Sequence, residues 1–166
     1  CRTNMKKIAI IGSGYVGLVS GAGLSEFGNR VCCLDIDESK IEKLKNGHIP
    51  IYEPGLSRLI NKNTQKGLLS FSSEISKEIK IAEIIFIAVG TPQSKDGSAN
   101  LSFVESAAKT IGKNINNYKI ICTKSTVPVG TGREIIRKLS KKNMEGEMFD
   151  YVSNPEFLRE GSAVND

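Results

Sequence analysis

A glycine-rich segment and one acidic residue carry the clearest chemistry in this sequence. The segment Gly12–Gly17 follows an apolar run directly, and Asp35 follows the next apolar run, 18 residues beyond Gly17. In such a segment the first glycine permits a tight turn, the second lets the backbone approach a pyrophosphate, and the third lets a helix pack closely on a strand. A helix that begins there offers free N–H donors and its positive dipole end to a phosphate.

The acidic residue indicates which dinucleotide would bind. A carboxylate at the position of Asp35 accepts hydrogen bonds from the adenosine ribose hydroxyls and repels a 2′-phosphate, so the pattern predicts NAD rather than NADP. Lys40 is a nearby cation that would tolerate some additional phosphate. Two alternatives remain open at this point: a glycine-rich turn that binds nothing, and a flavin site.

Hydroxyl-bearing residues follow two later apolar runs. Thr91 comes just after Ile84–Val89, and Ser125, Thr126 and Thr131 follow the run that ends near residue 122. In an open α/β sheet such positions lie at the carboxyl ends of the strands, where ligands bind. A structural turn explains Thr91 equally well, and helix capping explains one of the other three hydroxyls but not the whole set.

A pair of acidic residues near the end of the sequence could handle protons. Glu156 and Glu160 are four residues apart, so on a helical turn both carboxylates face the same way. Beside a nicotinamide and a sugar, such a pair could move a proton or hold a water molecule. The alternative is a solvated turn in which Arg159 balances the charge.

The elements that must position these residues alternate along the chain. Strands that are apolar throughout and separated by helices are typical of a parallel sheet covered on both faces. Right-handed crossovers then predict an α/β fold with a doubly wound, parallel six-stranded sheet of the Rossmann type. The expected strands are Lys6–Ile11, Arg30–Leu34, Leu68–Phe71, Ile84–Val89, Lys119–Cys122 and Tyr151–Ser153, and the expected helices are Val16–Phe27, Glu38–Lys45, Gly55–Asn61, Ser73–Ile81, Phe103–Lys113 and Gly130–Lys141.

Composition excludes several classes of protein. With 166 residues, 39% hydrophobic and 25% charged, the chain is long enough for one domain with a packed core. No apolar run approaches the length of a membrane span, and the net charge of +5 is spread without long basic runs, so we expect neither a membrane nor a nucleic-acid partner.

The four cysteines show neither zinc spacing nor a disulfide framework, which predicts no metal site and a reducing, cytoplasmic setting. We expect Cys32, Cys33 and Cys122 to be small apolar residues of two strands rather than nucleophiles. We also expect Met5 to be the natural start, residues 1–4 to be a foreign remnant, and residues 5–166 to form the dinucleotide-binding domain.

Taken together, these segments resemble the UDP-glucose 6-dehydrogenase family of nucleotide-sugar dehydrogenases. The resemblance runs in order from Met5 to the end of the sequence. The matching segments are Gly12–Leu18, Asp35–Asp37, Ile51–Leu56, Val89–Pro92, Lys124–Gly130 and Asn154–Gly161.

The resemblance implies an oxidation of the sugar C6 alcohol of UDP-glucose to the carboxylate of UDP-glucuronate, with two NAD used in succession. It also implies a role in polysaccharide biosynthesis and a homo-oligomeric full-length enzyme. In the family a cysteine captures the aldehyde, and this cysteine lies in a C-terminal domain whose motif the sequence does not contain. We therefore expect the chain by itself to be inactive.

The family's site residues carry over by motif onto three sets of positions. The catalytic set is Thr126, Glu156 and Glu160; the substrate-binding set is Glu156, Phe157, Leu158, Arg159 and Glu160; and the NAD-binding set is Gly12, Ser13, Gly14, Tyr15, Val16, Gly17, Asp35, Lys40, Thr91, Thr126 and Glu160. The alternatives are a GDP-mannose or UDP-N-acetylmannosamine dehydrogenase and a non-catalytic NAD-binding module. The pair Glu156 and Glu160 argues against the last, since a non-catalytic module has no evident use for it.

Overall fold

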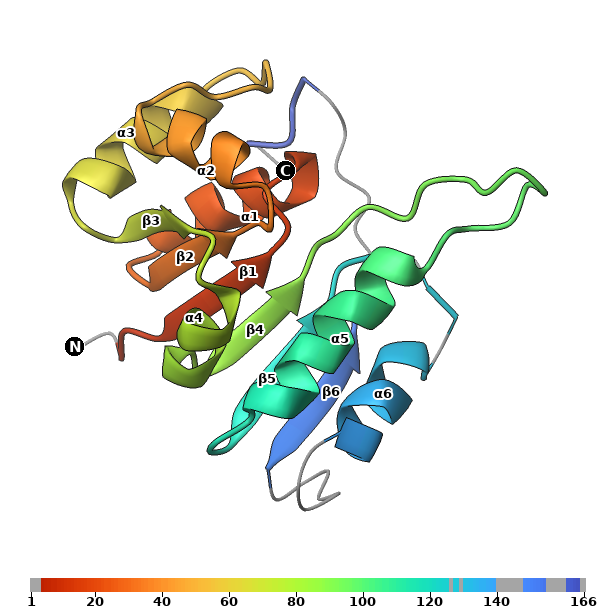
Figure 1. Cartoon of the computed structure of the whole chain (residues 1–166). Helices are drawn as coiled ribbons and strands as arrows, with labels where there is room; N and C mark the ends of the chain where they lie inside the picture. Colours follow the sequence, from red (N-terminus) through yellow and green to blue (C-terminus); the bar gives the residue numbers. More distant parts are fainter. Residues whose placement is uncertain (1–3, 126, 129, 140–147, 155–160, 165–166) are drawn as a thin grey trace.

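The computed structural model describes residues 4–125, 127–128, 130–139, 148–154 and 161–164. Strands and helices alternate along the chain (Figure 1). The strands are β1 (Lys7–Ile11), β2 (Arg30–Leu34), β3 (Leu69–Ser72), β4 (Ile84–Ile87), β5 (Lys119–Thr123) and β6 (Phe149–Ser153). The helices are α1 (Tyr15–Glu26), α2 (Glu38–Lys45), α3 (Leu56–Gln65), α4 (Ile75–Ile81), α5 (Ser102–Asn114) and α6 (Thr131–Leu139). In this described part of the chain, no helix is long and apolar enough to cross a membrane.

All six strands are parallel and form one sheet in the order β3-β2-β1-β4-β5-β6. This order confirms the predicted doubly wound sheet of the Rossmann type. The direction of strand progression reverses between the neighbours β1 and β4. In such a sheet the carboxyl ends of the two strands at the reversal form a crevice, which is where ligands bind.

Alternate side chains along β1 pack into two different hydrophobic cores, one on each face of the sheet. Ile8 and Ile10 of β1 pack with α1, α2 and α3, whereas Ala9 and Ile11 pack with α4, α5 and α6. Figure 1 shows the two helix layers on opposite faces of the sheet. The prediction that both faces are covered holds for β1 to β3.

The second half of the sheet is covered differently. Ile120 of β5 and Val152 of β6 lie on the α1 face and are 39% and 48% exposed, respectively. On the same face, Cys122 of β5 is buried, so cover on this side of the second half is uneven among the described residues.

The ends of β4 and α3 differ from the predictions, and each lies at a contact with a residue distant in the sequence. β4 ends at Ile87 rather than Val89. The next carbonyl, that of Ala88, lies so close to Gly12 that a Cβ on Gly12 would stand 2.5 Å from the Ala88 oxygen. α3 continues to Gln65 through a polar stretch because the buried Asn63 donates to Glu26 Oε2 of α1 at 2.9 Å. The bounds of β2 and α2 are as predicted.

Candidate functional site

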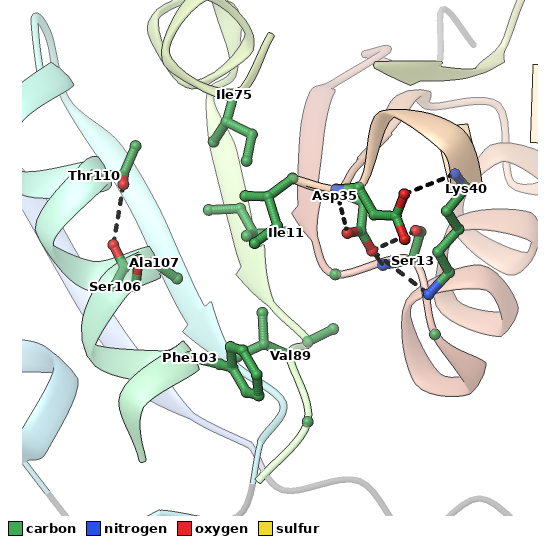
Figure 2. A pocket seen from close by; sticks show the side chains of 16 residues that line it. Ile11, Ser13, Asp35, Lys40, Ile75, Val89, Phe103, Ser106, Ala107 and Thr110 are labelled. Carbon is green, nitrogen blue, oxygen red and sulfur yellow. Dashed lines mark hydrogen bonds and ion pairs between the residues drawn. The ribbon is translucent and has the colours of Figure 1, made fainter. Parts of the chain in front are cut away.

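A cavity of about 450 Å³ opens at the carboxyl ends of the strands, where the strand order reverses (Figure 2). One wall comes from the first half of the sheet: the loop after β1, residues 35–37 after β2, and Lys40 of α2. The opposite wall comes from the second half: the chain after β4 and the side of α5 that begins at Phe103. Both βαβ halves therefore contribute to one site.

The three glycines of the loop after β1 have separate roles. Gly12 has a φ of +108° and passes close to Ala88, and a Cβ on Gly17 would stand 1.9 Å from the Gly12 oxygen. Gly14 lines the cavity, and apart from its chain neighbours nothing described lies within 4 Å of the place where its Cβ would be. The fold therefore requires Gly12 and Gly17, whereas the space beside Gly14 is left for a ligand.

The first turn of α1 begins at this loop. Gly14 is the N-cap and has no side chain to accept from the first N–H groups of the helix. The first turn contains no acidic residue, so no side chain of the turn itself offsets the positive end of the helix dipole. Such a helix start suits an anionic group such as a pyrophosphate.

The Asp35 carboxylate holds this loop through hydrogen bonds. Oδ2 accepts from the Ser13 backbone N–H at 3.2 Å and from the Ser13 hydroxyl at 2.7 Å. Oδ1 accepts from the Asp37 N–H at 3.1 Å, and the Lys40 ammonium lies 3.5 Å from Oδ2. Because the Ser13 side chain is fully buried, its hydroxyl fastens the loop to the end of β2. The carboxylate still borders the cavity.

These contacts keep Asp35 ionised. Partial burial by itself raises the pKa of a carboxyl group, but the hydrogen bonds from Ser13 and Asp37 and the charge of Lys40 outweigh burial, so the pKa of Asp35 lies below its ordinary value. At neutral pH the site therefore presents a carboxylate that can accept from hydroxyl groups of a ligand. It also presents an ammonium that offsets the charge.

Apolar side chains form much of the remaining wall. Phe103 and Ala107 of α5 lie across the cavity from Asp35, and Ile75 of α4 adds a further apolar side chain to the lining (Figure 2). Ile36 also lines the cavity, although it is 77% exposed. Flat apolar walls beside a polar network fit a planar heterocycle attached to a ribose. The glycine loop, Asp35 and these walls thus fit a dinucleotide.

No pattern in the sequence predicts this apolar wall as a whole. Phe103 lies 68 residues after Asp35 in the chain, and only the sheet topology brings the two to one cavity. Ile36, an apolar residue directly after Asp35, is a local signal for this wall in the sequence. Ile36, Asp37, Val89 and Gly90 of the lining lie in the segments Asp35–Asp37 and Val89–Pro92 that the sequence singles out, whereas the lining residues without any such signal are Ile75, Ala88, Phe103, Ser106, Ala107 and Thr110.

The predicted site residues fall into three groups. Gly12, Ser13, Gly14, Asp35 and Lys40 line the cavity. Tyr15, Val16, Gly17 and Thr91 do not line it. Thr126 and the whole predicted substrate set, Glu156, Phe157, Leu158, Arg159 and Glu160, lie outside the described residues.

Two hydroxyls of the predicted set after β5 lie in the described residues, and both donate to backbone carbonyls. The Ser125 hydroxyl donates to the Val89 oxygen at 2.6 Å, and the Thr131 hydroxyl donates to the Pro128 oxygen at 3.0 Å. Ser125 therefore links the chain after β5 to Val89, a residue that lines the cavity.

The three described cysteines have the structural character predicted for them. Cys32, Cys33 and Cys122 are buried within β2 and β5. Burial raises the pKa of Cys32 to about 11 and also raises the pKa of Cys33 and of Cys122. Thiols with raised pKa values are poor nucleophiles at neutral pH. Among the residues described, no three His, Cys, Asp or Glu side chains gather as metal ligands would.

The sheet and the cavity at its point of reversal define a Rossmann-type dinucleotide-binding domain. Comparison with known families agrees, since the model of the UDP-glucose/GDP-mannose dehydrogenase family, NAD binding domain, matches residues 6–166. The chain belongs to this family and is its NAD-binding domain. The predicted cofactor, NAD, is thereby confirmed.

Individual relatives point in the same direction. The chain is 59% identical over 163 residues to UDP-glucose 6-dehydrogenase TuaD of Bacillus subtilis, covering 98% of this chain and 35% of the relative. A UDP-glucose dehydrogenase structure from Pyrobaculum islandicum matches with a TM-score of 0.90 and 39% identity, covering 99% of this chain and 39% of that one. A GDP-mannose dehydrogenase structure from Pseudomonas aeruginosa matches with a TM-score of 0.87 and 35% identity, covering 96% and 38% of the two chains. The chain thus spans less than two fifths of the length of these relatives.

Proposed function

We propose that this chain is the cofactor-binding part of an enzyme that oxidises UDP-glucose to UDP-glucuronate with NAD as hydride acceptor. The observation that carries the choice of sugar is the high identity, over nearly all of this chain, to a protein named UDP-glucose 6-dehydrogenase. The cavity between the two halves of the sheet supports the choice of cofactor.

The residues of the cavity would divide the binding of NAD among them. The start of α1 and the open side of Gly14 would receive the pyrophosphate, because that is where backbone N–H groups and free space coincide. Asp35 would accept from the ribose hydroxyls, with Lys40 partly neutralising its charge. Phe103 and its apolar neighbours would pack on the adenine.

The proposal keeps the roles predicted for residues outside the described part of the chain. Thr126, Glu156 and Glu160 would serve the chemistry, with Glu156 aiding proton transfer and Thr126 ordering water. In the full-length enzyme, Thr126→Ala and Glu156→Gln should each lower turnover about 10²–10⁴-fold with the fold intact. Near-parental turnover together with a lowered melting temperature for Thr126→Ala would show that Thr126 only stabilises the structure.

Substrate choice is tested by assaying the full-length enzyme with three nucleotide sugars. UDP-glucose should yield two NADH per sugar, and GDP-mannose and UDP-N-acetylmannosamine should yield none above background. The family name and the GDP-mannose dehydrogenase structure make GDP-mannose the second candidate. NADH formation with GDP-mannose alone would replace the proposed sugar, and NADH formation with none of the three would favour a non-catalytic module.

The chain by itself should bind NAD without oxidising UDP-glucose. Capture of an aldehyde needs a thiolate that can reach the sugar, and the three described thiols are buried with raised pKa values. The assay is absorbance at 340 nm with the purified 166-residue chain, UDP-glucose and NAD. Steady turnover that disappears in a Cys33→Ser, Cys122→Ser double variant would contradict the structural role given to these cysteines.

A further inference from the structure

A second carboxylate near the loop after β1 is almost wholly removed from solvent. Glu53 lies in the loop before α3 and is 5% exposed. Its Oε2 accepts from the Tyr15 hydroxyl at 3.1 Å and from the Gly161 N–H at 2.8 Å, and its Oε1 accepts from the Ala163 N–H at 2.7 Å. One carboxylate therefore joins the first turn of α1 to a segment more than 100 residues further along the chain.

The segment that Glu53 holds is packed as well as hydrogen-bonded. Ala163 is 5% exposed and belongs to the core formed with α1 and α3, and Val164 packs against the same core. In Figure 1 this short blue segment, beside the C-terminal label, lies next to the start of α1. Gly55, with a φ of +81°, makes the turn after Glu53 and comes close to the Val164 side chain.

Hydrogen-bond donors stabilise the negative charge of the Glu53 carboxylate. Burial by itself raises the pKa of a carboxyl group, but the N–H groups of Gly161, Ala163 and Val164 and the Tyr15 hydroxyl outweigh burial, and the pKa of Glu53 lies below its ordinary value. Both oxygens are used, so a glutamine would place an NH₂ group opposite a backbone N–H. Substitution by glutamine must therefore break at least one bond of the cluster.

We propose that Glu53 is a positioning residue: its carboxylate fixes the turn at Gly161–Val164 on the first turn of the cofactor helix. The Asn154 N–H donates to the Thr123 oxygen at 2.9 Å, so the chain is also fixed at the end of β6. The sequence between these two anchors contains the predicted substrate set. Glu53 thus fixes the end of that sequence at Gly161–Val164, and the consequence for catalysis rests on the proposed function.

The direct test is amide hydrogen exchange, followed by NMR, on the 166-residue chain. In Glu53→Gln, exchange at Gly161 and Ala163 should accelerate by at least about tenfold, while the Ala88 amide, which donates to Ile11 in the core, keeps its protection. Glu83→Gln is the matched control, because the exposed Glu83 carboxylate also accepts a backbone N–H, from Lys7, but lies away from the cluster. It should leave Gly161 and Ala163 unchanged.

Two results of this experiment would overturn the proposal. Unchanged exchange at Gly161 and Ala163 in Glu53→Gln would show that the carboxylate does not hold the turn. An equal acceleration at Ala88 would show that Glu53 supports the whole fold instead. Neither result depends on which sugar the enzyme oxidises.

The functional arm uses the full-length enzyme. Glu53→Gln should lower kcat/KM for the nucleotide sugar by at least about tenfold, with the Kd for NAD⁺ within about threefold of the parent. An unchanged kcat/KM, or a Kd for NAD⁺ that weakens as much as kcat/KM falls, would contradict the positioning role. A parent enzyme inactive on every nucleotide sugar would refute the proposed function, and the exchange experiment would still decide the role of Glu53.

Discussion

The two halves of the sheet reach the same cavity with different chemistry. At the ends of β1 and β2, polar groups face the cavity: the open glycine loop, the Asp35 carboxylate and the Lys40 ammonium. In the second half, apolar side chains of α5 such as Phe103 line the cavity, and the Ser125 hydroxyl after β5 donates to a backbone carbonyl. We therefore propose that the first half binds the charged and hydroxylated part of NAD and that the second half packs on its flat apolar part.

The largest effects should come from the glycines of the first half. Gly12→Ala or Gly17→Ala should destabilise the domain by at least about 3 kcal/mol, because the new Cβ meets backbone atoms at 2.5 Å or 1.9 Å. Gly14→Ala is the matched control, since its Cβ enters open space; it should cost at most about 1 kcal/mol as a poorer N-cap.

Gly14→Ala should nevertheless weaken NAD⁺ binding at least about tenfold, because the methyl group occupies ligand space. Thermal unfolding and calorimetry separate the two kinds of effect. Equal losses of stability in all three variants would show that the loop has no position set aside for a ligand.

The next largest effect concerns the carboxylate of the first half. Asp35→Ala should weaken NAD⁺ binding by about 1–3 kcal/mol, because charge-assisted hydrogen bonds to the ribose are lost. Ser125→Ala removes a hydrogen-bonded hydroxyl of the second half and should leave the Kd for NAD⁺ within about twofold, since that hydroxyl faces the Val89 oxygen. Similar losses of affinity in the two variants would remove the distinction between the halves.

A smaller effect should follow from the apolar wall of the second half. Phe103→Ala should weaken NAD⁺ binding by about 0.5–1.5 kcal/mol, the usual worth of an aromatic contact. Because Phe103 is 47% exposed, the melting temperature should change little. Fluorescence titration measures the affinity, and unchanged binding would place the adenine elsewhere.

The smallest effect should be that of pH. The pKa of Asp35 is lowered in the folded chain, so its contribution to stability is present above the unfolded value of about 3.9 and is lost as pH falls through the folded pKa. The Kd for NAD⁺ should therefore be nearly constant between about pH 5 and 8. A midpoint inside that range, absent from Asp35→Asn, would mean that burial dominates the pKa of this carboxyl.

The sequence was sufficient for features built from neighbouring residues. The bounds of β2 and α2, the glycine loop and the cavity-lining position of Asp35 all follow from patterns within about one βαβ unit. The wall at Phe103 and the cluster around Glu53 were not predicted, because each depends on chain segments brought together only by the completed sheet. Glu53 lies in the segment Ile51–Leu56 that carries part of the family resemblance, but its partners at 161–164 leave no local signal.

We propose that the cavity at the ends of β1, β2 and β4 binds NAD and that Asp35 sets the preference for NAD over NADP. Isothermal titration calorimetry of the 166-residue chain with NAD⁺ and with NADP⁺ is the decisive experiment. We expect saturable, one-to-one binding of NAD⁺, with clearly weaker binding of NADP⁺. Equal affinity for the two would contradict the role of Asp35, and no binding of either would contradict the site.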